Sequence, residues 1–221
     1  MKALRSGYVQ GMPTGGPECE AFERELERWY GVPHARVFNS GTAALQAAVQ
    51  ACSVKRINVP VYSMSASAAA VLHAGAIVAF NDIEDDYMLG GYTGTEAMQV
   101  HLFGHHQMRD PRQNLLFIHD AAQSPTLKPD RNRPQDVWCY SLNQHKPIQC
   151  GEGGYALTFS QEIADRLHLV RNHGESVSAD ILGHNFRMTE MQAAIAREEF
   201  RSLDERITAR RLWAAEMQER Y

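Results

Sequence analysis

Residues 137–154 read Val-Trp-Cys-Tyr-Ser-Leu-Asn-Gln-His-Lys-Pro-Ile-Gln-Cys-Gly-Glu-Gly-Gly. The apolar run 137–142 predicts a strand, and the glycine-rich stretch 151–154 lets the backbone turn sharply after it. Between them stands Lys146, the only lysine that follows Lys128 in the chain. Most lysines are solvated surface charges, but this one has proline, isoleucine and cysteine as close neighbours. We therefore interpret Lys146 as a nucleophilic amine presented after a strand.

Short apolar runs and helical segments alternate along the chain. The apolar runs fall at 35–38, 57–61, 76–80, 98–103, 115–119 and 137–142, and a further strand is expected at 154–158. Helical patterns cover 18–30, 42–52, 65–74 and 161–173, and the capping-box spacing of Thr189 and Gln192 opens a long helix that reaches Arg220. Strands that alternate with helices in this way predict an α/β fold with a mainly parallel sheet.

The amino-acid composition and charge of the chain exclude some classes of binding partner. The 221 residues are 44% apolar, which is enough for a sizeable core. The 22 basic and 26 acidic residues are well mixed and leave a net charge of -4. No basic stripe indicates a nucleic acid partner, and no apolar stretch approaches the length of a membrane span. Since the N-terminus is also too polar for a signal peptide, we expect a cytoplasmic protein.

Cysteine and histidine patterns argue against a disulfide framework and a metal site. The four cysteines, at 19, 52, 139 and 150, have no CxxC spacing, so free buried thiols are expected. The densest histidine group is His101, His105 and His106. A strand is expected up to residue 103, and Gly104 breaks it, so the helical spacing of a metal site does not apply. We predict no metal.

A small-residue turn leads into a helix at Asn39-Ser40-Gly41-Thr42, and an alanine-rich run follows. Such a turn presents free N–H groups and the positive end of the helix dipole to an anion, and Thr42 adds a hydroxyl. Taken alone, the same pattern fits an ordinary N-capped helix equally well.

A carboxylate ends the apolar run Leu-Leu-Phe-Ile-His-Asp at residues 115–120. Open α/β sheets place ligand-binding groups at the carboxyl ends of their strands, so Asp120 could hold a cationic ring nitrogen in its protonated form. The alternative is a carboxylate that caps the turn after the strand. An enzyme that depends on pyridoxal 5'-phosphate (PLP) needs an anion-binding turn, an acid at a strand end and an amine such as that of Lys146. The sequence offers all three. No GxGxxG, GxxxxGK[ST] or GxSxG motif competes with this interpretation.

In this order, the segments resemble the DegT/DnrJ/StrS family of fold-type I, PLP-dependent sugar aminotransferases, over residues 5–221. The motifs that carry the resemblance are Arg-Ser-Gly-Tyr-Val-Gln-Gly at 5–11, Asn-Ser-Gly-Thr-Ala-Ala-Leu at 39–45, His-Asp-Ala-Ala-Gln at 119–123, Ser141 with Lys146, Gly-Glu-Gly-Gly at 151–154, Arg-Asn-His-Gly at 171–174 and Asn-Phe-Arg-Met at 185–188. The resemblance implies a three-layer α/β/α sandwich.

The resemblance also implies a role for individual residues. Lys146 and Asp120 would be catalytic: Lys146 would bind PLP as a Schiff base and carry a proton, and Asp120 would pair with the pyridine nitrogen. Gln123 would lie near the phenolic oxygen of the ring. The remaining cofactor contacts would come from Gly41, Thr42, Ala43 and Ser141 at the phosphate, from Met64 where relatives stack an aromatic or histidine on the ring, and from Asn185.

Two further expectations concern substrate and assembly. Asn185 matches an asparagine that reaches the phosphate of the neighbouring subunit, which implies a homodimer with shared active sites. Arg187 is expected to contact substrate. The implied reaction moves an amino group from an amino acid, with glutamate as the expected donor, to a keto sugar carried on a nucleotide.

The chain departs from the family pattern in several places. The connections 83–97, 105–114 and 124–136 are shorter, and the first strand and helix of the family are not found before residue 5. We expect residues 1–187 to form the PLP-binding large domain. Residues 188–221 would form a long C-terminal helix leading into a small domain that is absent here.

Two other functions stay open. His145 beside Lys146 keeps a sugar dehydratase in view, because relatives that dehydrate sugars use histidine in place of the lysine. The chain could also be a non-catalytic or split subunit that needs a partner for the missing C-terminal domain. The presence of Lys146, Asp120 and Gln123 together favours the aminotransferase.

Overall fold

The computed structural model describes residues 14–105, 115–175 and 181–220. The motif expected at 5–11 and the histidine His106 lie outside these described residues. No helix within the described ranges is both long and apolar enough to cross a membrane.

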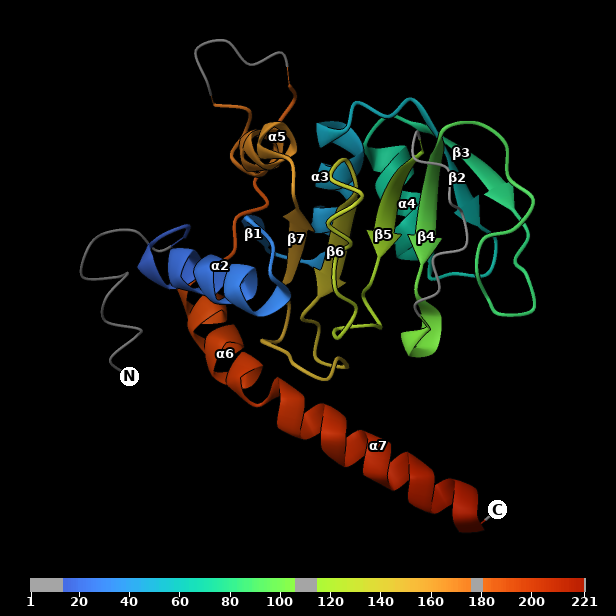
Figure 1. Cartoon of the computed structure of the whole chain (residues 1–221). Helices are drawn as coiled ribbons and strands as arrows, with labels where there is room; N and C mark the ends of the chain where they lie inside the picture. The colour runs from blue at the N-terminus through green and yellow to red at the C-terminus, as the bar shows by residue number, and fades with distance from the viewer. Residues whose placement is uncertain (1–13, 106–114, 176–180, 221) are drawn as a thin grey trace.

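Seven strands form one sheet (Figure 1). In spatial order they are β1 (His34–Phe38), β7 (Gly154–Thr158), β6 (Val137–Ser141), β5 (Leu116–Asp120), β4 (Glu96–Val100), β2 (Arg56–Pro60) and β3 (Ile77–Asn81). Strand β7 runs antiparallel to both of its neighbours, and all other neighbouring pairs are parallel. The predicted mainly parallel sheet is confirmed.

Helices cover both faces of the sheet and make three layers, as predicted (Figure 1). One face carries α3 (Gly41–Ala51), α4 (Ser65–His73) and α5 (Gln161–Arg171). The other carries α2 (Pro17–Tyr30) and α6 (Glu190–Arg201), which pack on each other. Gly31 ends α2 in the left-handed conformation, with φ 71°, that glycine adopts without strain.

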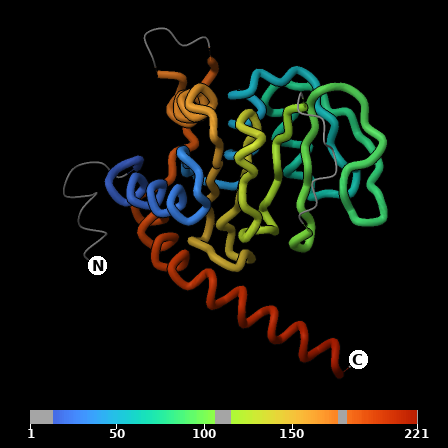
Figure 2. The backbone as a smooth tube through the Cα atoms, in the orientation of Figure 1, coloured from blue at the N-terminus to red at the C-terminus, as the bar shows by residue number. Residues whose placement is uncertain are grey.

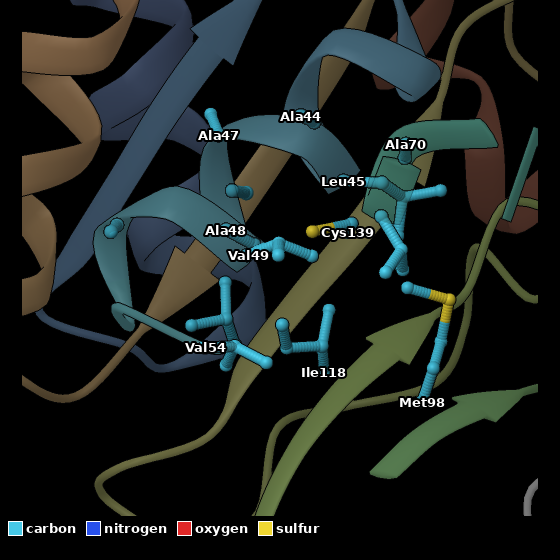
Figure 3. Packing of buried hydrophobic residues seen from close by; sticks show 14 of the residues in the cluster. Ala44, Leu45, Ala47, Ala48, Val49, Val54, Ala70, Met98, Ile118 and Cys139 are labelled. Atoms are coloured by element: carbon cyan, nitrogen blue, oxygen red, sulfur yellow. The ribbon is translucent and has the colours of Figure 1, made fainter. Parts of the chain in front are cut away.

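Alanines bring α3 close to the middle of the sheet. Figure 3 shows Ala44, Ala48 and Val49 of this helix facing Cys139 of β6 and Ile118 of β5. All five side chains are buried, and the small alanine side chains let the helix backbone approach the strands. This contact fixes the N-terminus of α3 beside the carboxyl ends of the central strands.

Loops cover part of the second face. Within the described residues, the connections 82–95 and 121–136 contain no helix, in agreement with the short connections expected there. Leu89, Tyr92, Leu115 and Phe117 form a small apolar cluster under the first of these loops. Among the residues that the structure describes, these loops cover the face over β4 and β5.

Two sequence predictions were wrong in detail. The strand expected over 98–103 ends at Val100, and Leu102–Gly104 forms a 3-10 turn in which Phe103 has a φ of 55°. The long helix expected from Thr189 to Arg220 is two helices, α6 and α7 (Leu203–Arg220).

The capping box that opens α6 is present as predicted. The break follows at Ser202, whose N–H and hydroxyl both bond to the carbonyl of Glu199. A side chain that competes for a backbone carbonyl in this way disturbs the regular helical pattern. Beyond Leu203, which is buried, α7 extends past the edge of the sheet with an exposed surface (Figure 2).

Candidate active site

A cavity of about 240 Å³ lies between the N-terminus of α3 and the turns that follow β4, β5 and β6. This is the edge of the sheet where open α/β folds bind their ligands. Seven of the predicted catalytic and cofactor-binding residues line it, namely Gly41, Thr42, Met64, Asp120, Gln123, Ser141 and Lys146.

The N-terminus of α3 meets the end of β6 at close range. A Cβ on Gly41 would lie 2.9 Å from Cβ of Ser141, and a Cβ on Gly154 would lie 2.6 Å from N of Gly41. Both positions therefore need glycine. Ser40 caps the helix by accepting a 3.0 Å hydrogen bond from N–H of Ala43, so that donor is already used and Ala43 does not line the cavity. The first turn contains no acidic residue, which leaves its positive end open to an anion.

Asp120 is buried at the end of β5 and has two hydrogen-bond donors. The hydroxyl of Ser67 donates to Oδ2 at 2.7 Å, and N–H of Ala122 donates to Oδ1 at 3.1 Å. Burial raises the pKa of Asp120, while the two hydrogen bonds and the positive charge of Lys146 oppose that rise. The carboxylate thus both caps its turn and lines the cavity.

Gln123 is held by the turn that follows β4. Its Oε1 accepts a 3.0 Å hydrogen bond from N–H of Phe103, the residue with positive φ. With the amide oxygen used in this way, the NH2 group is the part of the side chain left to donate to a ligand in the cavity.

Lys146 stands on a hydrogen-bonded turn after β6. N–H of Lys146 donates to the carbonyl of Asn143 at 2.9 Å, and the side chain of Asn143 donates to Oε1 of Glu152 at 2.7 Å. Gly151 turns the chain back with a φ of 86°. The side chain of Lys146 is half-buried, which leaves its amine accessible from the cavity.

Three predicted site residues lie at the rim of the cavity or outside it. Met64 stands at the N-cap of α4 and lines the cavity with 65% of its surface exposed. Asn185 is exposed and does not line this cavity, and its carbonyl accepts a hydrogen bond from the side chain of Asn39. Arg187 is half-buried and also lies outside the cavity lining.

The family assignment rests on comparison of the whole chain. The family model described as the DegT/DnrJ/EryC1/StrS aminotransferase family matches residues 1–220. The chain belongs to this family.

Relatives in this family are longer than the region over which they match this chain. The UDP-N-acetyl-3-dehydro-alpha-D-glucosamine 3-aminotransferase of Acidithiobacillus ferrooxidans is 31% identical over 84% of this chain and 57% of its own length. Streptomyces venezuelae DesV, solved with a ketimine intermediate, matches 92% of this chain and 62% of its own with a TM-score of 0.82 and 29% identity. Bacillus subtilis NtdA, solved with bound cofactor PMP, matches 91% and 52% with a TM-score of 0.78 and 25% identity. The chain thus spans a little more than half the length of these relatives.

Three residues in or beside the cavity were not predicted to belong to the site. Ser67 supports Asp120 from inside a predicted helix, and nothing local links it to a carboxylate 53 positions away. Asn143 and His101 line the cavity itself. The position of Asn143, between the strand and Lys146, was the one signal that could have found it, since asparagine often organises turns.

Proposed function

We propose that this protein is a PLP-dependent aminotransferase that acts on a keto sugar carried by a nucleotide. The observation that carries the proposal is that Lys146, Asp120, Gln123 and the N-terminus of α3 line one cavity. The carboxylate and the amide come from the turn after β5 and the amine from the turn after β6, and each matches a different part of a single cofactor.

The donor set fits PLP group by group. A phosphate suits the free N-terminus of α3, where Thr42 and Ser141 add hydroxyls. The pyridine nitrogen suits the buried carboxylate of Asp120, and the phenolic oxygen suits the amide NH2 of Gln123. Met64 offers a polarisable thioether to a ring face. When bound, PLP supplies the electron sink that stabilises a carbanion at the amino-acid carbon.

Each residue of the site has its own proposed role. Lys146 would hold the cofactor through its amine and would carry a proton during the transfer. Asp120 keeps the ring nitrogen protonated, and the hydrogen bonds from Ser67 and Ala122 hold its carboxylate in place. The glycines at 41 and 154 keep the phosphate cradle compact, because a side chain at 41 would separate α3 from β6 and one at 154 would separate α3 from β7.

The proposed substrates follow from the relatives. The Acidithiobacillus relative is named for a 3-dehydro sugar linked to UDP, and another, from Streptomyces venezuelae, for a sugar linked to dTDP. We assign glutamate as the amino donor and a nucleotide-linked keto sugar as the acceptor. A cytoplasmic location is part of the proposal, because all four cysteines are free thiols, as is usual in a reducing compartment.

The proposed assembly is a homodimer with shared active sites. Exposed apolar side chains gather on α4, the edge strand β3 and the loops beside the cavity, and they include Tyr62, Met64, Leu72, Ile77, Phe80, Tyr87 and Phe103. An apolar surface of this kind favours association. Asn185, exposed and outside its own cavity, would reach the phosphate of the second copy. Mixing Lys146→Ala with Asn185→Ala should then restore part of the activity that each variant lacks, whereas independent sites would restore none.

The proposed domain division places residues 1–187 in the PLP-binding domain and 188–221 in helices that lead toward a small domain. The exposed surface of α7 supports a segment that leads away from the PLP-binding domain, whereas α6 packs on α2 and joins the core of that domain. A polypeptide that supplies the remaining family length would be expected to raise turnover when mixed with this chain.

The decisive experiment is the visible absorption spectrum of the purified chain with PLP, before and after L-glutamate. The wild type should show a band that glutamate bleaches, and Lys146→Ala should lack it. Lys55→Ala, an exposed lysine away from the cavity, is the matched control and should behave as wild type. Absence of a Lys146-dependent band would refute the proposal.

A dehydratase remains the second candidate because His145 also lines the cavity. Product analysis separates the two reactions, since dehydration yields no aminated sugar. An aminated product from wild type and from His145→Gln would assign the aminotransferase.

A further inference from the structure

A second groove, of about 330 Å³, lies between α7 and the turns that follow β4, β5 and β6. Helix α7 runs past the edge of the sheet at which these strands end (Figure 1). Four residues of α7 line the groove, and their spacing is that of a single helical face: Ile207, Arg210, Arg211 and Ala214.

This groove adjoins the cavity of the candidate active site. Gln123 lines both of them. Lys146 lines the cavity, and Pro147, the next residue in the chain, lines the groove. A ligand with one end at Lys146 can therefore extend past Gln123 and along the face of α7.

Contacts of the first turns of α7 hold the helix in this place. Leu203 is buried in the core, and Ile207 packs against the same apolar cluster. Between them, the guanidinium of Arg206 donates to the carbonyl of Pro147 at 3.2 Å and forms an ion pair with Glu199. The wall that α7 gives to the groove is thus fixed to the turn that carries Lys146.

The two arginines of the groove differ from the other arginines of α6 and α7. Each of those others forms an ion pair with a glutamate, and they are Arg197, Arg201, Arg206 and Arg220. Within the part of the chain that the structure describes, neither Arg210 nor Arg211 has an ion pair, and no acidic residue lines the groove beside them. Both side chains are exposed. Two positive charges therefore meet at the groove without a counter-charge.

This arrangement suits an anion that carries two negative charges. The diphosphate that links a nucleotide to a sugar carries two, and guanidinium groups bind phosphate oxygens through paired hydrogen bonds. The neighbouring cavity does not offer such a site, because Lys146 is the one lysine or arginine among its described lining residues and Asp120 opposes its charge. A diphosphate outside the cavity therefore needs cations of its own.

We propose that Arg210 and Arg211 bind the diphosphate of a nucleotide-linked sugar, with the sugar directed past Gln123 toward Lys146. The delivery of an amino acceptor to Lys146 rests on the proposed function. The binding of a nucleoside diphosphate rests on the groove alone.

The first test measures binding of UDP to the PLP-loaded chain by calorimetry at low ionic strength, where exposed charges are least screened. PLP is added first, so that the N-terminus of α3 is already occupied. We expect UDP to bind without displacing PLP, and uridine and inorganic phosphate to bind at least tenfold more weakly. The double variant Arg210→Gln/Arg211→Gln should bind UDP roughly tenfold more weakly or worse, since it loses hydrogen bonds to a charged group.

The matched control is Arg201→Gln/Arg220→Gln. It removes two exposed charges from the same pair of helices, away from the groove, and should bind UDP as the wild type does. An equal loss in the control would reduce the effect to net charge and overturn the site. The proposal is also overturned by equal UDP affinity in wild type and Arg210→Gln/Arg211→Gln, by inorganic phosphate that binds as tightly as UDP, by displacement of PLP, or by a wild type that binds no UDP.

The second test separates the acceptor from the amino donor, because glutamate also carries two carboxylates that two arginines could hold. The L-glutamate concentration that half-bleaches the PLP absorption band should be the same in wild type and in Arg210→Gln/Arg211→Gln. A large increase in the double variant would assign the arginines to the donor and overturn the proposal.

The same measurements distinguish failure of this site from failure of the proposed function. A chain without a Lys146-dependent absorption band would overturn the proposed function. UDP binding to that cofactor-free chain that still depended on Arg210 and Arg211 would leave the diphosphate site standing.

Discussion

The hydroxyl of Ser67 donates a 2.7 Å hydrogen bond to Oδ2 of Asp120, and both side chains are buried. The contact joins the first turn of α4 to the carboxyl end of β5, across 53 positions of sequence. It lets a carboxylate remain in a site from which water is largely excluded, because a buried charge is tolerated only with hydrogen-bond donors.

Removal of this donor should weaken cofactor binding. Hydrogen bonds to charged groups contribute about 1.5–3 kcal/mol, so Ser67→Ala should reduce PLP affinity by roughly tenfold or more. The measurement is a PLP titration followed by visible absorption. Ser65→Ala, an exposed serine in the same turn of α4, should change affinity little. Equal affinities in the two variants would show that Asp120 does not depend on Ser67.

Asp120 should lower the stability of the cofactor-free chain at neutral pH. Burial raises its pKa in the folded state above the ordinary value of 3.8, so the folded state binds the proton more tightly than the unfolded state. The free energy of unfolding then falls as pH rises from 3.8 through the folded pKa. Asp120→Asn should therefore stabilise the chain at pH 7, and the gain should vanish as the pH approaches 4.

Denaturant unfolding between pH 4 and pH 8 measures this effect. Asp85→Asn, an exposed aspartate away from the cavity, serves as the control and should show no comparable gain. A destabilised Asp120→Asn at pH 7 would contradict the prediction. The same variant should also lose transamination, because an amide cannot keep the ring nitrogen protonated.

Gly41→Ala should disrupt the phosphate cradle through one contact. Its Cβ would lie 2.9 Å from Cβ of Ser141, a distance that forces α3 and β6 apart. We expect loss of PLP binding and a fall in stability of about 1–3 kcal/mol, as for other overpacked sites. Adding Ser141→Gly removes the obstructing atom and should restore stability, measured by denaturant unfolding. A double variant as unstable as Gly41→Ala alone would show that this contact is not the cause.

Glu190 should stabilise the fold by capping a helix far from it in sequence. Its carboxylate on α6 accepts hydrogen bonds from N–H of Gly16, Glu18 and Cys19, at 2.9, 2.7 and 3.1 Å, at the N-terminus of α2. Glu190→Ala leaves these buried donors without their acceptor and should cost about 3 kcal/mol. Thermal and denaturant unfolding measure the loss. Glu198→Ala, an exposed glutamate on the same helix, should cost much less, and equal losses would refute the capping role.

Much of the fold and site could be predicted because residues that become buried follow a short-range pattern along the sequence. The alternation of apolar runs with helical periodicity predicted the mainly parallel sheet, and the family resemblance implied the three layers. The positions of Asp120 and Lys146, each just after a strand, predicted that both would lie at one edge of that sheet, since parallel strands end on the same side.

Other features depended on contacts that no local pattern encodes. Residues 101–103 were predicted to continue the strand because Leu102 and Phe103 are apolar, but Phe103 adopts a positive φ and bonds to Gln123 from another turn. The break between α6 and α7 arises where Ser202 bonds to Glu199 and Leu203 enters the core. Helical periodicity continued through this point and gave no warning of it.

The sequence by itself determined the fold class, the order of the elements and the chemical groups available to the cavity, because these follow from local hydrophobic period and residue type. Only the tertiary structure decided that Ser67 supports Asp120, that Glu190 caps α2, and that the rings of His101 and His119 meet. Each of these is a hydrogen bond between groups far apart in the chain, and its geometry exists only once the sheet and its two helical layers have closed around it.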